Sequence, residues 1–403
     1  MKKLTKTFGV FAILASFAYI SCSSPKTTQL SDSPVAIVEQ VGNDKIITAD
    51  IHAFKDTVDI LLSSIAGKLE IIPLESKIEA FFKYGTLSIS DNYIGIRTNE
   101  PASFKLFDRK GNYLRDIGMR GNGPGEYRNI YSATIDEKNG KIYILPWQTS
   151  TLLVFGLDGT RYPSIPFPIG EEGMQYYAPK GIFRVNEDAT VTVAVLPVVG
   201  TASYVWTQDI QGNLIKSIGV PASIEYVDYS SEIAAGNNTG DFDPFWMIYG
   251  NKSNDPLYKY SLSENRMIPI FTVKNIQDME PPYYSYSQIP GYFIGERIPG
   301  MVRNEYGWYS ALRPKYFIVD KNTLHGAYYK LKIDELGGID VDPYFSEGYF
   351  IMNSSAIGFK EKLQKLLDGR DIKDSAMRKK IEELNNSIDE EDNNIVILGK
   401  LKD

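Results

Sequence analysis

Arg120, Asn122, Glu126, Tyr127 and Arg128 form the densest group of side chains that could bind a ligand. Three glycines and a proline lie between them, so backbone N–H groups can face an anion while two guanidinium groups add positive charge. No Lys-Ser or Lys-Thr pair follows the glycines, which excludes a phosphate loop. The segment predicts either a site for an acidic, carboxylate-bearing ligand or a connection between strands in which Arg120 and Glu126 pair with each other.

Residues for covalent or metal chemistry are scarce elsewhere. The only cysteine is Cys22, the two histidines are His52 and His325, and no G-x-S-x-G or H-x-x-x-H pattern occurs. Nucleophilic catalysis and a zinc site are therefore not expected, and we predict no cofactor. Carboxylate and amide oxygens in Asn237–Asp243 and Asp340–Asp342 leave calcium as an alternative, although neither segment has EF-hand spacing.

Aromatic side chains are concentrated in four further segments: Tyr176–Tyr177, Pro281–Tyr286, Tyr292–Phe293 and Trp308–Tyr309. Rings in loops can bind sugars or peptide prolines, and rings in an all-β protein also fill the core. Both roles stay open for these segments.

The N-terminus has the pattern of a secretory leader. Three lysines precede the apolar run Phe8–Ile20, which is too short to span a bilayer, and Tyr-Ile-Ser then precedes Cys22. This order resembles a lipobox and predicts a lipoprotein signal peptide over residues 1–21 and a diacylglycerol on the Cys22 thiol. The alternative is an ordinary secretory signal. Residues 22–35 are polar and read as a flexible tether, so we expect an outer-membrane lipoprotein on either face of that membrane.

Amino-acid composition and net charge limit the fold classes and the partners that we expect for this chain. The 403 residues include 27 Tyr, 33 Gly and 21 Pro, which favours many short strands separated by turns. The net charge is −7, and removing the three lysines of the leader lowers it to −10. A body this acidic repels nucleic acid and anionic membrane surfaces, so neither is an expected partner and the lipid is the expected membrane contact.

An internal repeat organises the body. Asp108–Gly118 recurs as Asp209–Gly219, 101 residues later, with Asp, Gly, Asn, Ile and Gly repeated, and Leu157–Tyr162 supplies a weaker copy between them. The unit is therefore about 50 residues of short strands, which indicates propeller blades. Each copy places Asp, Gly or Asn where a tight hairpin needs positive φ.

The repeat predicts an all-β fold, a β-propeller of about six blades over residues 68–403, preceded by an N-terminal extension over 36–67. Later strand pairs are weaker. They are Leu257–Tyr260 with Met267–Phe271, Tyr316–Asp320 with Ala327–Leu331, and Tyr349–Met352 with Asn394–Leu398. Because a ring must be closed, we predict that Leu69–Leu74 and Asn394–Leu398 share the last blade.

One segment has helical periodicity. Apolar residues recur at helical spacing before Gly369 and again after Asp374, which predicts a C-terminal helical insertion over about 356–388. We expect an antiparallel helix pair packed on the side of the propeller, and a partner-docking helix is the alternative.

The chain resembles the NHL-like six-bladed β-propeller lipoproteins of Gram-negative bacteria. Four stretches carry the resemblance: Leu62–Glu75, Phe107–Gly111, Gly118–Tyr127 and Glu391–Leu398. The resemblance implies the six-bladed fold and lipid anchoring but no defined activity.

These observations favour a lipid-anchored, non-enzymatic envelope protein that binds a peptide, protein or glycan. Segment 120–128 joins the outer strand of one blade to the inner strand of the next, and connections of that sense converge on one mouth of a propeller. We therefore expect the ligand there. The alternative function is a propeller hydrolase or lyase of the lactonase type with a calcium site on the axis.

Overall fold

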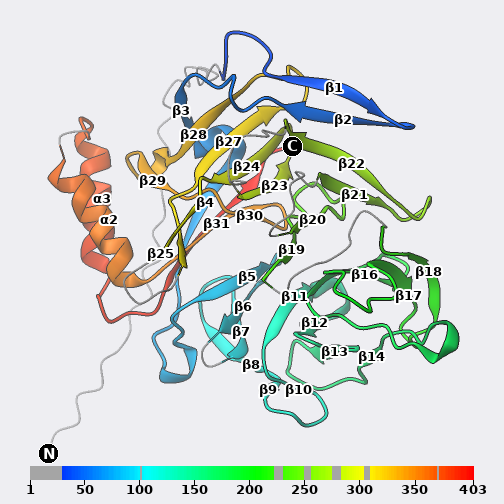
Figure 1. The fold of residues 1–403 in the computed structure, drawn as a ribbon. Helices are drawn as coiled ribbons and strands as arrows, with labels where there is room; N and C mark the ends of the chain where they lie inside the picture. Colours follow the sequence, from blue (N-terminus) through cyan, green and yellow to red (C-terminus); the bar gives the residue numbers. More distant parts are fainter. Residues whose placement is uncertain are drawn as a thin grey trace, which may run out of the picture.

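Six blades of β-strands stand around a common axis in the computed structural model, which describes residues 30–99, 102–221, 230–248, 256–274, 283–303, 309–369 and 372–403 (Figure 1). This confirms the predicted all-β, six-bladed propeller. In each blade the first strand lies nearest the axis, and later strands follow outward.

Each of the first three blades is built from one continuous stretch of chain. Blade one contains β5 (Gly85–Ile89), β6 (Tyr93–Asn99), β7 (Ala102–Asp108) and β8 (Tyr113–Ile117). Blade two contains β11 (Ile130–Asp136), β12 (Lys141–Pro146), β13 (Thr151–Gly156) and β14 (Ile165–Pro166). Blade three contains β15 (Gly181–Val185), β16 (Val191–Val195), β17 (Val205–Gln208) and β18 (Leu214–Ile218). The middle strands β12 and β16 are almost fully buried because neighbouring blades cover both faces.

The repeated Asp-x-x-Gly-Asn sequence makes the turn between the third and outer strands. The Asp108 carboxylate accepts from the backbone N–H groups of Lys110 and Asn112 at 2.8 and 2.9 Å, and Asp209 holds the equivalent turn in blade three. Gly111 has φ +88°, and a Cβ there would lie 2.1 Å from the carbonyl oxygen of Pro73. Glycine is thus required both by the turn and by the close approach of the neighbouring blade.

The last three blades take strands from both ends of the chain. Blade four contains β19 (Glu232–Ala235), β20 (Pro244–Met247), β21 (Leu257–Ser261) and β22 (Arg266–Val273), with β2 (Asp44–Ala49) and β1 (Ala36–Val41) at its outer edge. Blade five contains β23 (Tyr283–Ile289), β24 (Tyr292–Ile298), β27 (Lys315–Asp320) and β28 (Gly326–Ile333), with β3 (Thr57–Leu61) and β29 (Ile339–Val341) paired to β28. A hairpin of β25 (Met301–Arg303) and β26 (Tyr309–Ala311) lies between β24 and β27 in the chain. The segment 36–67 thus adds strands to these two blades.

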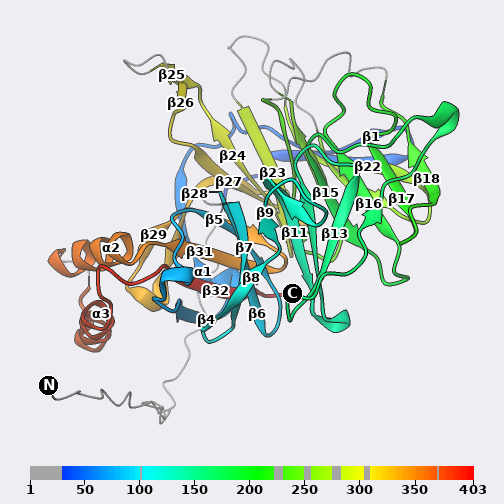
Figure 2. The same ribbon diagram turned by 90° about the horizontal axis from the view of Figure 1, so that it is seen from below.

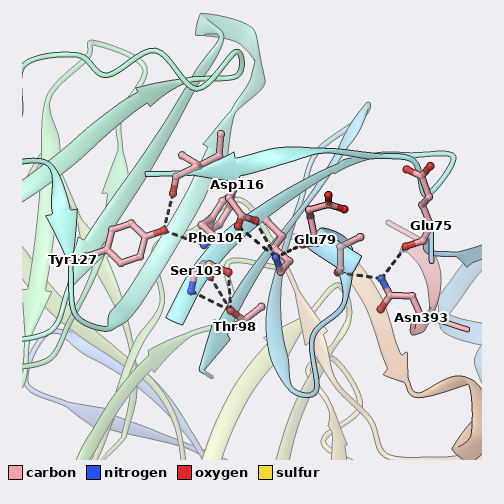
Figure 3. A network of polar contacts seen from close by, with 11 residues as sticks. Glu75, Glu79, Thr98, Ser103, Phe104, Asp116, Tyr127 and Asn393 are labelled. Atoms are coloured by element: carbon pink, nitrogen blue, oxygen red, sulfur yellow. Dashed lines mark hydrogen bonds and ion pairs between the residues drawn. The ribbon is translucent and has the colours of Figure 1, made fainter. Parts of the chain in front are cut away.

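Blade six closes the ring with strands from both termini, as predicted. It contains β30 (Phe345–Ser346), β31 (Tyr349–Ser354), β32 (Ile395–Leu401) and β4 (Ala66–Pro73). In the ladder between β32 and β4, Val396 is paired with Ile72 and Leu398 with Glu70. Next to this ladder, the Asn393 amide donates to the carbonyl oxygens of Glu75 and Ala80 at 3.0 Å each (Figure 3).

The predicted helical insertion is confirmed between β31 and β32. Helix α2 (Ala356–Asp368) begins at Ser355, whose hydroxyl accepts from Gly358 N–H, and α3 (Ser375–Ser387) begins at Asp374, whose carboxylate accepts from Ala376 N–H. The pair lies on the outside of the propeller (Figures 1 and 2). Its buried residues Phe359, Leu363 and Ile381 pack in one cluster with strands of blades five and six and with the short helix α1 (Leu62–Ile65).

Candidate ligand-binding site

A cavity of about 720 Å³ lies on the propeller axis. Inner strands of five blades line it: Thr86 lies in β5, Tyr131 in β11, Ile182 in β15, Ala234 in β19 and Ser346 in β30. Because every inner strand presents alternate side chains to the axis, residues far apart in sequence meet there. The volume is in the range of small-ligand sites.

A hydrogen-bonded group joins blades two, three and four at one side of the cavity. The Tyr131 hydroxyl donates to Glu232 Oε2 at 2.7 Å and accepts from Ile233 N–H at 3.1 Å. Lys180, only 5% exposed, donates through Nζ to Glu232 Oε1 at 2.6 Å and to the Ser231 carbonyl oxygen at 2.9 Å. Burial, reinforced by the Glu232 carboxylate, raises the pKa of Tyr131 well above its usual value, so this hydroxyl stays protonated.

Trp147 offers an exposed ring beside this group. Its indole stacks with Tyr131 at a centroid distance of 6.1 Å, and Lys180 Nζ lies 5.4 Å from its ring centroid. The side chain is nevertheless 45% exposed. The cavity wall therefore includes an aromatic surface held in place by a stacked ring and a cation.

Arg97, at the end of β6, brings a cation to the cavity without a carboxylate partner. Its Nη2 donates to Thr86 Oγ1 at 3.0 Å and its Nη1 reaches the Ile130 carbonyl oxygen at 3.4 Å. Its buried Nε has no hydrogen-bond partner, and no ion pair to Arg97 occurs among the residues that the structure describes. Burial lowers the pKa of Arg97, but an arginine stays charged at neutral pH.

Glu347 crosses the axis from the turn between β30 and β31. Its Oε2 accepts from Ile89 N–H in blade one at 2.7 Å, its Oε1 lies 3.5 Å from the Thr134 hydroxyl in blade two, and its own N–H donates to Gly236 in blade four. It has φ +55°, an unfavourable conformation for a residue with a Cβ. Burial raises the pKa of the Glu347 carboxyl to about 7.

A second cavity of about 300 Å³ lies beside the first, between blades four, five and six. Tyr286, Tyr316 and Tyr329 line it, and Glu232 and Tyr344 line both cavities. The two spaces are therefore neighbouring parts of one axial region.

The structure places Tyr127 in the core rather than on a surface. Its hydroxyl donates to the Ile117 carbonyl oxygen at 2.6 Å and accepts from Phe104 N–H at 3.1 Å (Figure 3). Burial raises the pKa of Tyr127 far above its usual value. This residue anchors its segment between blades one and two.

The other predicted site residues lie in the same exposed connection. β9 (Met119–Arg120) and β10 (Glu126–Tyr127) pair in parallel, Glu126 Oε2 accepts from Gly123 N–H at 2.8 Å, and Arg128 Nε donates to Asn122 Oδ1. No ion pair joins Arg120 to Glu126 in this described segment. The connection does run from the outer strand β8 to the inner strand β11, as expected, but of its residues only Asn129 lines the cavity. Ligand binding by segment 120–128 stays a prediction.

The remaining candidates lie apart from one another. Cys22 and Trp308 fall outside the described residues, His52 is exposed, and His325 Nδ1 lies 2.8 Å from the Ser31 carbonyl oxygen. Tyr176 packs on Trp206 with ring centroids 5.1 Å apart. Within the described ranges, no helix is long and apolar enough to cross a membrane.

Of the calcium candidates, Asp243 is fully buried and accepts from Asn237 N–H at 2.8 Å, while its second carboxylate oxygen has no hydrogen-bond partner. Burial raises its pKa to about 7. Asp241 pairs with Lys259, and Asp340 lies 3.8 Å from Lys332. No group of three or more His, Cys, Asp or Glu side chains comes together in the described part of the chain. Calcium binding stays untested by these contacts.

The sequence analysis missed Arg97, Tyr131, Trp147, Glu232 and Glu347. Each is a single polar or aromatic residue in or beside a strand, with no local motif around it. The available signal is weak: the inner strands β5 and β11 carry polar residues among their apolar ones, and Glu347 occupies a two-residue hairpin turn where Asn is usual.

The family model described as "Domain of unknown function (DUF4934)" matches residues 46–400. The chain belongs to this family. The solved structure of the "Putative exported protein (BF0058)" from Bacteroides fragilis NCTC 9343 is similar, with a TM-score of 0.56 and 16% identity, over 87% of this chain and 99% of that one. A member of the duf4221 family from Bacteroides vulgatus ATCC 8482 covers 84% of this chain and 97% of its own, with 13% identity and a TM-score of 0.42. No curated protein matches. At such identities the first likeness supports the fold of this DUF4934 member, and not an activity.

Proposed function

We propose that this DUF4934 protein is a lipid-anchored envelope protein whose propeller binds a ligand in the axial cavity, without catalysing a reaction. The observation that carries the proposal is the cavity itself, a space of about 720 Å³ to which five blades contribute side chains. A packed core would fill such a space, whereas a binding protein keeps it open.

The lining favours a polar, hydroxylated ligand among the peptide, protein and glycan classes. Hydroxyl and amide side chains from three inner or adjoining segments face the space: Thr86, Ser88, Asn129, Ser132 and Thr134. Trp147 adds a ring of the kind on which sugars stack. Ser88 and Ser132 donate to backbone carbonyl oxygens inside the protein, and their hydroxyl oxygens can still accept from the hydroxyl groups of a glycan.

A blocking variant tests the site. Ala234 is exposed in the cavity, so Ala234→Trp should fill it without removing a polar contact. Screened on glycan and peptide arrays and then measured by calorimetry, the wild type should bind a ligand that Ala234→Trp does not. Ala376→Trp, on the exposed surface of α3, is the matched control and should bind normally. Equal binding by Ala234→Trp would contradict the axial site.

The anchor is tested separately, because Cys22 lies outside the described residues. Mass spectrometry of the mature N-terminal peptide should find a lipid-modified Cys22, and Cys22→Ala should move the protein from the membrane fraction to the soluble fraction. The name of the Bacteroides fragilis protein supports export but not lipidation. An unmodified Cys22 in the mature wild type would remove the anchor from the proposal.

A hydrolase or lyase is the second candidate, and one observation favours it. The Glu347 carboxyl lies on the axis with its pKa raised to about 7, where a carboxyl can exchange a proton with a bound ligand. If the protein is such an enzyme, chromatography of the ligand after incubation should reveal product, with or without added calcium, and Glu347→Gln should abolish its formation. An intact ligand would support binding alone.

A further inference from the structure

Arg97 is a cation of the axial cavity that has no carboxylate of the described residues at ion-pair distance, although the Glu232 carboxylate acts on its charge from farther away. Its two hydrogen bonds are to a hydroxyl and, at 3.4 Å, to a carbonyl oxygen, both neutral acceptors. Its buried Nε has no acceptor among the described residues. A half-buried guanidinium with a buried donor and no anion is costly unless something supplies the missing acceptor.

The carboxylates of the cavity are already engaged. The Glu232 carboxylate accepts from Lys180 at 2.6 Å and from Tyr131 at 2.7 Å, so an ammonium group and a hydroxyl group already donate to it. Glu347 accepts from Ile89 N–H at 2.7 Å and lies within reach of Thr134. Neither forms an ion pair with Arg97 within the described structure, so the guanidinium can still bind the anion of a ligand.

The groups around Arg97 indicate which chemical groups such a ligand carries besides its anion. Thr86 Oγ1 lies 3.0 Å from the guanidinium, and Asn99, Asn129 and Trp147 line the same cavity. Hydroxyl and amide groups next to an aromatic ring suit the hydroxyls and the apolar face of a sugar ring. The combination favours an anionic sugar over an acidic peptide.

From this arrangement we infer that the axial cavity binds a glycan with a carboxylate-bearing sugar, of the hexuronic acid type, and that Arg97 binds the carboxylate. The inference rests on the proposed function and names the ligand class of the same site. A guanidinium carries five N–H donors in a fork that matches a carboxylate, and Arg97 uses two of them in hydrogen bonds to described residues. Lys180 is less suited to this role because its ammonium group already forms an ion pair with Glu232 at 2.6 Å.

The test compares three probes of one size by calorimetry: a hexuronic acid disaccharide, its methyl ester, and the neutral hexose disaccharide. The wild type should bind the acid at least about tenfold more tightly than the ester, since a hydrogen-bonded charged group contributes about 1.5–3 kcal/mol. Arg97→Gln should bind acid and ester equally. Arg97→Lys should keep only part of the preference, because a lysine lacks the fork. Arg313→Gln, at an exposed arginine that lines neither cavity, is the matched control and should bind as the wild type does. Arg128→Gln tests separately whether segment 120–128 binds the anion.

The outcomes separate this inference from the proposed function. If Ala234→Trp abolishes binding while Arg97→Gln leaves the ratio of acid to ester unchanged, the cavity is the site and the carboxylate inference is wrong. If Arg128→Gln rather than Arg97→Gln removes the preference, the anion is bound by segment 120–128. A wild type that binds none of the acidic probes overturns the inference, and the array experiment with Ala234→Trp then decides the proposed function independently. A sulfated disaccharide that binds more tightly than the acid would assign Arg97 to sulfate instead.

Discussion

Blades one to three and blades four to six reach the same architecture by different routes. The first three are continuous stretches, each closed by an Asp-Gly turn that pairs neighbours in sequence. In the last three, β2 pairs in parallel with β22 and β3 in parallel with β28, while β4 pairs antiparallel with β32. Residues more than 200 positions apart therefore form ladders. The second half is thus held by long-range pairing that the first half does not need.

The difference teaches where the ring is vulnerable. Pairing of segments that are distant in sequence costs more chain entropy and forms late in folding. Blades four to six therefore fold only after the terminal segments have paired with them. Blades one to three can form their hairpins locally. We therefore expect a substitution that removes similar contacts to lower the free energy of unfolding more in blades four to six than in blades one to three.

Removing the C-terminal strand should have the largest effect. Deletion of residues 393–403 removes β32, whose residues Val396, Ile397 and Leu398 are fully buried, and leaves β31 and β4 without the strand between them. We expect insoluble protein or loss of the cooperative unfolding transition in calorimetry. Removing only Asp403 is the control. An unchanged transition in the longer deletion would show that the ring does not depend on this ladder.

Asn238 and Tyr127 give a matched pair of buried polar groups, one in each half. The Asn238 amide donates to the Gln288 carbonyl oxygen at 3.1 Å and accepts from Gly348 N–H at 3.2 Å, which joins blades four, five and six. Asn238→Ala should cost about 2–3 kcal/mol in unfolding free energy, because several buried groups lose their partners. Tyr127→Phe leaves Phe104 N–H and Ile117 without theirs and should cost about 1–2 kcal/mol.

Native-state hydrogen exchange distinguishes the two variants. Asn238→Ala should reduce protection across blades four to six, and Tyr127→Phe only around β7, β8 and β11. Equal loss of protection over the whole ring in both variants would contradict the division into two halves.

The pH dependence of stability tests the turn at Glu347, whose side chain and backbone contact blades of both halves. Its folded pKa of about 7 lies above the unfolded value of 4.5, so the folded state holds the proton more tightly. The contribution of Glu347 to stability is therefore fully present below about pH 4.5 and falls as pH rises through 7. Between pH 5 and 7.5 the wild type should lose about 1–2 kcal/mol relative to Glu347→Gln in chemical denaturation.

Asp243, whose pKa is also raised to about 7, changes stability in the same direction. It is present in both proteins, so its effect cancels in their difference. A difference between wild type and Glu347→Gln that is independent of pH would show that the carboxyl does not change protonation in this range.

Much of the fold was predictable, since its signals are local. The Asp108 and Asp209 turns, the apolar strands between them, and the two helices with their N-terminal caps all depend on residues within a few positions. The closing ladder was predicted on topology, because a ring needs both ends. The pairing of Ile47 with Phe271 had no such signal, so 36–67 was set apart as an extension although its strands extend blades four and five.

The candidate site was less predictable for a related reason. Segment 120–128 is conspicuous because its glycines and charges are adjacent in sequence. Arg97, Tyr131 and Glu232 are each surrounded by ordinary strand residues, and they become a group only when blades one, two and four meet at the axis. A run of glycines and charged residues that are adjacent in sequence identifies a turn well. It identifies an axial site poorly, because the residues of that site come from strands that are far apart in the chain.

Substitutions in segment 120–128 should have the smallest effect and sharpen the comparison between this exposed connection and the axial cavity. Arg120 and Arg128 are exposed, and the Arg128 side chain donates to Asn122 in the same segment. Arg120→Ala and Arg128→Ala should each change the unfolding free energy by less than about 0.5 kcal/mol in thermal melts. If these variants also bind every ligand that the wild type binds, the segment is a connection between blades. If either weakens ligand binding tenfold without lowering the melting temperature, the segment contributes to the site, and the mouth of the propeller extends outward from the axis to the edge of blade two.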